Sequence, residues 1–234
     1  MAEVRALSAH HEFREAVELQ RQIWRFDDIE LVPARLYVVA TRIGGQVLGA
    51  FEGARMVGFC IALPGVGRDG TAYLHSHMLG VLPEYRDAGV GRALKLAQRE
   101  EALSRGIHLV EWTFDPLELK NAFFNIERLG AIARRYVHDQ YGVSTSPLQG
   151  GLPTDRCVAE WWLRAARANA PIELRWSVPA HIADLRASDP ERAQAIQAAT
   201  ADALERAFAE GLAVIGFERT DEAGTYLLGQ WQRQ

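Results

Sequence analysis

The sequence of 234 residues contains only two cysteines, Cys60 and Cys157, and they lie far apart. Two distant cysteines form neither the closely spaced ligand set of a metal site nor a disulfide framework, so we expect no metal. A chain that does not rely on disulfides suits a reducing compartment, and we expect a cytoplasmic protein. Cys60 lies in an apolar segment, which favours a buried core residue over a nucleophile.

The chain also lacks a long apolar run and an excess of basic residues. No segment has the roughly 20 consecutive apolar residues of a membrane-spanning helix, and the N-terminal residues do not follow the plan of a signal peptide. The formal net charge of −4 disfavours nonspecific nucleic-acid binding, which usually requires a basic surface. We therefore expect no nucleic-acid partner and no membrane partner.

The sequence does contain enough apolar residues for a sizeable core, since hydrophobic residues make up 48% of it. Strand and helix patterns alternate from Ala72 onward, which predicts an α/β fold with parallel or mixed strand pairing in a sheet covered by helices. The composition changes at 164–171, and we expect a domain boundary there. The predicted domains are 1–165 and a small C-terminal α+β extension, 171–234.

Hydrophobic periodicity and turn residues predict the individual elements. Helices are expected at 8–25, 33–41, 91–104 and 119–129, and from a Ser188 cap to 210. Strands are expected at 4–7, 46–52, 56–63, 72–82, 107–114, 131–139, 157–163, 172–178, 213–219 and 225–231. Gly80 is expected to mark a strand bulge, and loops are expected at 64–70 and 141–155.

The most informative segment runs from Val81 to Leu94. A strand is predicted to enter a glycine-bearing turn that opens directly into an amphipathic helix. Such a turn aims several unpaired backbone N–H groups at one point, and the helix start adds the positive end of its dipole. The sequence therefore predicts an anion site, for a group such as a diphosphate. Gly89 and Gly91 would allow close backbone approach or a positive φ.

The pattern R-x-x-G-x-G at 86–91, preceded by V-x-P-E-Y at 81–85, resembles the acyl-CoA binding motif of the GCN5-related N-acetyltransferases (GNAT). The order of predicted elements is similar to this family over Val4–Leu163. The resemblance implies a GNAT-like twisted mixed β-sheet flanked by helices. It also implies transfer of an acetyl group from acetyl-CoA, or of another acyl group from its acyl-CoA, to an amine by direct attack in a ternary complex.

The same resemblance implies roles for the residues around the turn. Backbone amides at 87–91 would cradle the diphosphate, Arg86 and Arg92 would add positive charge, and the strand end would bind the pantetheine. The amide of Leu79 would also point at the thioester carbonyl, as an oxyanion-type contact. The expected cofactor-binding residues are Leu79, Gly80, Val81, Arg86, Asp87, Ala88, Gly89, Val90, Gly91, Arg92 and Asn121.

An acceptor ammonium group must lose a proton before it attacks, so a general base is useful. In the family this base is often a carboxylate on or near the strand before the motif. Here that strand offers His75 and His77, which are two residues apart and are expected to share a face with Leu79. Imidazole titrates near neutral pH, although either histidine would also fit a purely structural role. Glu111 and Asp115 are the alternatives, unless they serve as a solvated face or a helix cap.

The sequence departs from the family at the group that protonates the leaving thiolate. Many members have a tyrosine four residues after an alanine on the helix before the last strands. Aligned on Ala122 and on the Leu-Gly pair at 129–130, that position is Ile126. Tyr136, Tyr141 or water would have to replace it, or CoA would leave unassisted.

Two further segments, 112–117 (W-T-F-D-P-L) and 151–156 (G-L-P-T-D-R), are similar to a subgroup of acetyltransferase-like proteins without an assigned substrate. The acceptor is expected to be a small-molecule or protein amine, and Asp155 and Arg156 would either contact a polar acceptor or form a surface pair. The tail after 171 is expected to pack on the main sheet or on a second copy of the chain, and in the second case it would form part of a homodimer interface.

The missing tyrosine leaves open an acyl-CoA-binding sensor or interaction module without turnover. An enzyme with another acyl chain or an O-acceptor is a second alternative. A nucleotide-binding protein is a third, which the lack of Gly-Lys-Ser/Thr after the glycines disfavours.

Overall fold

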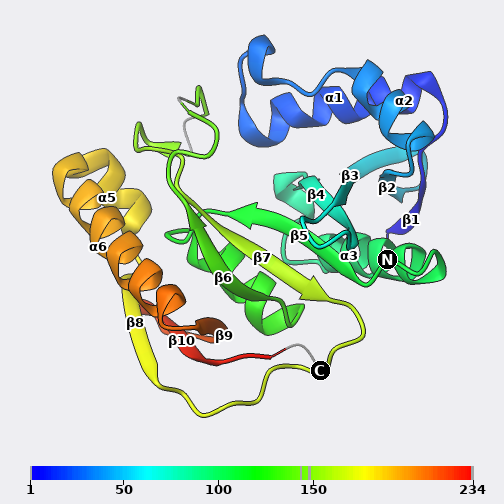
Figure 1. The fold of residues 1–234 in the computed structure, drawn as a ribbon. Helices are drawn as coiled ribbons and strands as arrows, with labels where there is room; N and C mark the ends of the chain where they lie inside the picture. Colours follow the sequence, from blue (N-terminus) through cyan, green and yellow to red (C-terminus); the bar gives the residue numbers. More distant parts are fainter. Residues whose placement is uncertain (1, 143, 147–148, 233–234) are drawn as a thin grey trace. The chain divides into compact units, whose positions relative to one another are not determined.

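The computed structural model describes residues 2–142, 144–146 and 149–232 (Figure 1). The chain divides into two compact units, Met1–Glu111 (unit 1) and Trp112–Gln234 (unit 2). The division falls inside the strand β5 (Leu109–Phe114). The fold is the mixed α/β arrangement of sheet and helices that the sequence predicts. Within the described residues, no helix is both long and apolar enough to cross a membrane.

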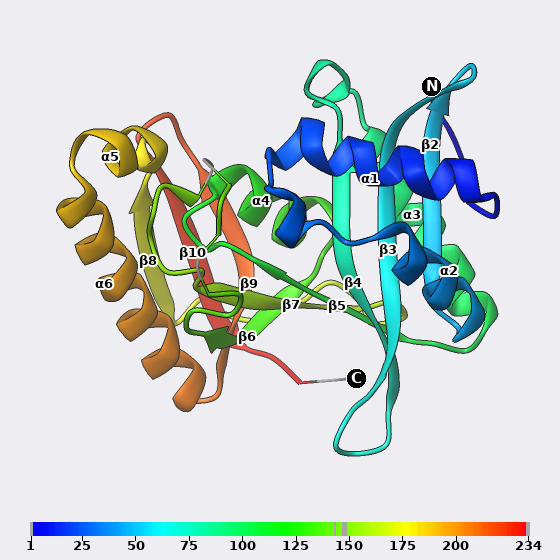
Figure 2. The same cartoon turned by 90° about the horizontal axis from the view of Figure 1, so that it is seen from above.

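Before β5, unit 1 contains β1 (Glu3–Ala6), α1 (His10–Trp24), η1 (Asp28–Glu30), α2 (Ala34–Arg42), β2 (Gln46–Glu52), β3 (Arg55–Val66), β4 (Ala72–Val81), η2 (Pro83–Tyr85) and α3 (Val90–Ser104). Its sheet has the order β1–β2–β3–β4–β5. Neighbours pair antiparallel from β1 to β4, whereas β4 and β5 run parallel. Helices α1 and α2 pack on one face of this sheet and α3 packs on the other, as Figure 2 shows.

The strand β4 carries a bulge, but not at the predicted residue. The register shifts between Ile61 and Ala62 of β3, and His77 is the extra residue on β4. The prediction of a bulge at Gly80 is wrong, because Gly80 pairs in regular register with β3. Packing explains the glycine instead, since a Cβ at this position would lie 2.7 Å from a ring carbon of Trp24.

The hairpin of β3 and β4 is longer than predicted. Residues 64–66 were expected in a loop, but they extend β3 and pair with β4 as far as Val66↔Ala72. The turn is closed by a hydrogen bond of 2.8 Å from the Gly67 N–H to the Thr71 carbonyl. The strand continues because the ladder is completed by its partner strand, which local sequence does not show.

After β5, unit 2 contains α4 (Leu119–Phe123), η3 (Phe124–Arg128), β6 (Ile132–Val137), β7 (Arg156–Trp162), β8 (Leu174–Pro179), α5 (Ile182–Ser188), α6 (Pro190–Ala209), β9 (Leu212–Arg219) and β10 (Ala223–Gln230). From β7 onward its strands have the order β7–β6–β9–β10–β8. Helix α6 packs against β6, β8 and β9. Because β9 pairs with β6, the segment after residue 171 continues the sheet of unit 2. A separate domain at 171–234 stays a prediction.

The predicted helix at 119–129 changes its winding halfway. The α-helical turn α4 passes into a π-helical turn, η3, in which the Leu129 N–H donates to the Phe124 carbonyl at 3.0 Å. Gly130 follows with φ +77°, as expected for a glycine that ends a helix. The wider turn fixes the direction of the buried side chains of Asn125 and Ile126.

Two helices occupy the region where one was expected to start at Ser188. Ser188 ends α5, a helix that was not predicted, and its hydroxyl donates to the Asp184 carbonyl at 2.7 Å. Asp189 is the residue that caps α6, because its carboxylate accepts the Arg192 N–H at 3.1 Å. Serine and aspartate are both good caps, so the sequence alone does not decide between these neighbours.

Candidate active site

The turn before α3 is exposed at residues 86–89. Asp87 has φ +61° and Gly89 has φ +81°, so the chain reverses within three residues before α3 begins. Among the described residues, no side chain caps α3, and its first turn contains no acidic residue. A Cβ at Gly89 would meet nothing within 4 Å, which leaves the approach to the N–H groups open. This arrangement fits a diphosphate.

The segment that leads into the turn is anchored to the β2–β3 hairpin. The Tyr85 hydroxyl donates to Glu52 Oε2 at 2.5 Å, and Arg55 forms an ion pair of 2.7 Å with Glu84. Arg86 Nε donates to the Val81 carbonyl at 3.3 Å. These exposed contacts join the Pro-Glu-Tyr-Arg segment to the strands beside the turn.

The edge of β4 that is opposite β3 presents further backbone N–H and C=O groups. Leu82 donates its N–H to the Val57 carbonyl of β3 at 3.0 Å. Because peptide groups alternate in direction along a strand, Gly80 also faces β3, whereas the N–H and C=O groups of Leu79 and Val81 face the opposite edge. The pairing with β5 lies in the first half of β4. The backbone of the last residues of β4 is thus directed as a pantetheine contact requires.

The three predicted catalytic residues come together in unit 1. The rings of His75 and His77 lie 6.1 Å apart between centroids, and Glu111 stands beside His75 across the parallel pairing of β4 and β5. Burial lowers the pKa of His77, so its imidazole is neutral at neutral pH and able to accept a proton. Their catalytic role stays a prediction.

Leu79 does not share the face of the two histidines. His75 pairs with Leu63, which packs with the core of α1 and α2. Leu79 packs with the core beneath α3. The prediction of a shared face is wrong, because the extra residue at His77 reverses the alternation of side chains along β4.

The comparisons with known proteins agree with this geometry. The family model for acetyltransferases of the GNAT family matches residues 5–130, which is more than half of the chain. The chain belongs to the GNAT family. Acetyl-CoA is therefore its expected acyl donor, as for the family as a whole. Among curated proteins, none matches the chain.

Solved structures of this family share its fold at low sequence identity. The ribosomal-protein-S18-alanine N-acetyltransferase of Escherichia coli has a TM-score of 0.54 at 15% identity, covering 73% of this chain and 99% of its own. NAA60 of Arabidopsis thaliana, in complex with a bisubstrate analogue, has a TM-score of 0.57 at 13% identity (69% and 98% covered). The yncA protein of Salmonella typhimurium, with its cofactor acetyl-CoA, has a TM-score of 0.56 at 16% identity (72% and 98%).

Within this GNAT chain, the position of the family tyrosine lies in unit 2 and is fully buried. Ile126 has no exposed surface and belongs to the π-helical turn. Asn121, predicted to reach the pantetheine, is exposed on α4, and its cofactor contact stays a prediction. A hydroxyl placed at Ile126 would therefore lie in the core of unit 2.

Two tyrosines were predicted as replacements, and they differ in their hydrogen bonds. The Tyr136 hydroxyl donates to Asp155 Oδ2 at 2.8 Å, and burial together with this carboxylate raises the pKa of Tyr136. A phenol held in this way is a poor acid. The Tyr141 hydroxyl is exposed and lies 2.7 Å from Thr113 Oγ1.

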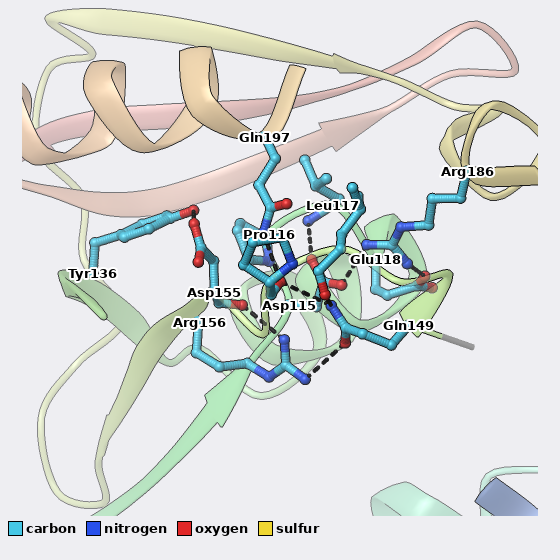
Figure 3. Close-up of polar contacts among 12 residues, drawn as sticks. Asp115, Pro116, Leu117, Glu118, Tyr136, Gln149, Asp155, Arg156, Arg186 and Gln197 are labelled. Carbon is cyan, nitrogen blue, oxygen red and sulfur yellow. Dashed lines mark hydrogen bonds and ion pairs between the residues drawn. The ribbon is translucent and has the colours of Figure 1, made fainter. Parts of the chain in front are cut away.

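The two segments that are similar to an unassigned subgroup meet in a buried polar cluster in unit 2, which Figure 3 shows. Arg186 of α5 forms ion pairs of 2.6 Å with Asp115 and 3.0 Å with Glu118. Gln197 of α6 donates to the Pro153 carbonyl at 2.8 Å. Arg186 and Gln197 were not predicted from the sequence, because their partners lie far away in the chain and leave no local signal.

Asp155 and Arg156 do not form a surface pair. Asp155 is buried, and its carboxylate accepts from the Tyr136 hydroxyl and from the Asp139 N–H. Arg156 donates to the Asp155 carbonyl and to Gln149 Oε1. Asp115 likewise accepts the Leu117 N–H at 2.8 Å. These carboxylates therefore stabilise the loops of unit 2.

Proposed function

We propose that this chain is an N-acetyltransferase that moves an acetyl group from acetyl-CoA to a primary amine, by direct attack in a ternary complex. The observation that carries the proposal is the exposed turn at Gly89, with its two positive φ angles, directly before an uncapped helix. The family of the chain and the outward-facing backbone of β4 support it.

On this proposal, the residues of unit 1 divide the work of binding. The amides at 87–91 hold the diphosphate, and Arg86 and Arg92 add positive charge beside it. The backbone of β4 at 79–81 binds the pantetheine, and the Leu79 N–H donates to the thioester oxygen as negative charge develops there. Acetyl-CoA supplies the activated acetyl group.

His77 is the best candidate for the general base. Its lowered pKa keeps the imidazole neutral, so it accepts the proton that the attacking ammonium group must lose. His75 stands next to it, and Glu111 stands beside His75. These two side chains would pass the proton on or orient the ring. The new C–N bond forms as the C–S bond breaks, and the thiolate takes a proton from water.

Direct attack is favoured over an acyl-enzyme because both cysteines are poor nucleophiles. Cys60 and Cys157 are fully buried, and burial raises the pKa of Cys60 to about 12 and that of Cys157 further. The thiolate, which is the reactive form, is therefore scarce at neutral pH.

The test combines calorimetry with an assay of CoA release. We expect the purified protein to bind acetyl-CoA and to release CoA when an accepted amine from a panel of small amines and peptides is added. Absence of binding would refute the proposal.

A second candidate is an acyl-CoA sensor without turnover, which the buried Ile126 favours. Tight binding of acetyl-CoA without CoA release by any amine in the panel would support the sensor. Competition among acyl-CoAs of different length then identifies the preferred acyl group in either case.

A further inference from the structure

A lysine is buried between the helix α3 and the strand β4. Lys95 is 2% exposed, and its Nζ donates to Ser76 Oγ at 2.8 Å and to Gln98 Oε1 at 3.0 Å. These bonds join α3, which begins at the turn at Gly89, to β4, which carries His75 and His77. Neither the anion site nor the proton transfer uses this lysine.

An amine at this position has an energetic disadvantage over an apolar side chain of the same length. A buried ammonium loses its hydration, and burial lowers the pKa of Lys95 to about 7. The chain contains two lysines, and the other, Lys120, is exposed, while arginine supplies its remaining basic side chains. An arginine would stay charged inside the protein, whereas a lysine can also lose its proton.

The neighbouring amide is oriented by this lysine. Gln98 presents Oε1 to Lys95, and its own Nε2 has no hydrogen-bond partner among the described residues. A flipped amide would place two donors against each other. In the bridge, Gln98 Oε1 therefore accepts from Lys95 while Nε2 stays unpaired.

The bridge ends on the residue that defines the bulge. Ser76 is the last β4 residue in register with Ala62 before the extra residue His77. Ser76 is buried, and its hydroxyl points to α3, where Lys95 binds it. If the bulge moved by one residue, the side chains between the old and the new position would change face. Ser76 would then lose its bond, and a histidine would turn toward α3.

We propose that Lys95 is a positioning residue: its bond to Ser76 Oγ fixes the bulge at His77 and so holds both histidine rings on the face covered by α1 and α2. The structural part of this inference is independent of the proposed function. Only its consequence for turnover rests on the proposal that these histidines act as the base.

The test compares Lys95→Met with Lys120→Met, a matched lysine substitution on the surface. Methionine keeps the length of the side chain and removes the amine. In Lys95→Met we expect the nuclear Overhauser contacts of the Ile61↔Met78 and Ala62↔Ser76 pairs to weaken or double. The pKa of His77, which burial lowers below its ordinary value in the parent protein, should move toward that value in an NMR titration. Lys120→Met should change neither.

The catalytic readout separates positioning from binding. We expect kcat of Lys95→Met to fall roughly 10- to 100-fold, because a small displacement of a catalytic group has effects of this size. The Kd for acetyl-CoA should change less than about twofold, since the turn at Gly89 is built from backbone. If the parent protein shows no turnover, the proposed function fails, but the NMR data still decide the inference.

Ser76→Ala is the second variant and removes only the acceptor. It should reproduce the NMR changes of Lys95→Met, and it answers the question if Lys95→Met does not fold. An unchanged strand register and an unchanged His77 titration in the folded variants would overturn the inference.

Discussion

The turn at Gly89 in unit 1 leaves its polar groups exposed, whereas the polar cluster around Arg186 in unit 2 buries them. At the turn, backbone N–H groups lie exposed before an uncapped helix. In the cluster, the carboxylates of Asp115 and Asp155 are buried and accept hydrogen bonds from the protein itself. The cluster satisfies its polar groups within the fold, whereas the turn leaves an uncapped helix start exposed, which is the arrangement that an anion site requires.

The largest effect is expected from Arg186→Met, which breaks the cluster. Asp115 and Glu118 would lose the cation that neutralises them, and removal of one partner of a buried ion pair destabilises a protein by about 3–5 kcal/mol. Urea unfolding measures this loss. Arg175→Met is the control, because Arg175 pairs with Glu218 on the surface and its loss should change stability by less than about 1 kcal/mol.

If the cluster is structural, folded Arg186→Met should bind acetyl-CoA within about twofold of the parent protein. A folded Arg186→Met protein that no longer binds acetyl-CoA would contradict the contrast between the two regions. A loss of stability no larger than that of Arg175→Met would contradict the importance of the ion pairs.

The second effect concerns Gly89→Val. A β-branched side chain at φ +81° is strained, and its methyl groups would occupy the space over the N–H groups. We expect the Kd for acetyl-CoA to rise about 100-fold, since the bound anion would lose several hydrogen bonds. Calorimetry measures the change.

Gly70→Val is the matched control for this strain. Gly70 has φ +80° and, as at Gly89, a Cβ placed there would meet no atom within 4 Å, but it lies in the β3–β4 turn. Both variants should lower the melting temperature to a similar extent, and only Gly89→Val should weaken acetyl-CoA binding. Equal affinities in the two variants would remove the turn from the binding site.

The third effect is a dependence of stability on pH that comes from Lys95. Its folded pKa of about 7 lies below the ordinary lysine value of 10.5, so the unfolded chain binds the proton more tightly. The destabilisation that comes from burying the protonated Lys95 is complete below pH 7. It decreases as the pH rises from 7 to 10.5. In that window Lys95 raises stability by up to about 1.4 kcal/mol per pH unit.

Urea unfolding of the parent protein and of Lys95→Met at pH 7, 8 and 9 isolates this contribution. The free energy of unfolding of the parent protein, relative to that of Lys95→Met, should increase as the pH rises. A constant difference would mean that Lys95 keeps its proton throughout the range.

The smallest effect is expected from Tyr85→Phe. The substitution removes the hydrogen bond to Glu52 that anchors the segment before the turn and leaves the ring in place. The Kd for acetyl-CoA should rise by no more than about threefold, because one exposed hydrogen bond contributes little. Calorimetry against Arg55→Gln, which removes the neighbouring ion pair, shows whether the two anchors act together.

The sequence predicts the turn at Gly89 well because the signal is local. Glycines, a preceding strand and a following amphipathic helix all fall within one short segment. The same holds for Gly130, which ends its helix as expected. The long strands and helices of both units are also recognisable, since their hydrophobic periodicity depends only on neighbouring residues.

Features that depend on distant partners could not be predicted. The bulge at His77 is defined by the register with β3, so both the position of the bulge and the face of Leu79 were predicted wrongly. Arg186 and Asp115 are 71 positions apart, and no pattern in the sequence connects them. The π-helical turn after Phe123 was not predicted for a related reason. Packing decides where the hydrogen-bond pattern of the helix changes.

The scarcity of lysine has a practical consequence for any enzymatic assay of this protein. Lys95 is enclosed by the core and Lys120 is exposed on α4, so amine-directed chemistry has a single accessible lysine side chain. Self-acetylation would accordingly add about 42 Da at Lys120, where one tryptic peptide reports it, and Lys120→Arg would give an enzyme whose acetylated-lysine signal arises from added acceptor alone.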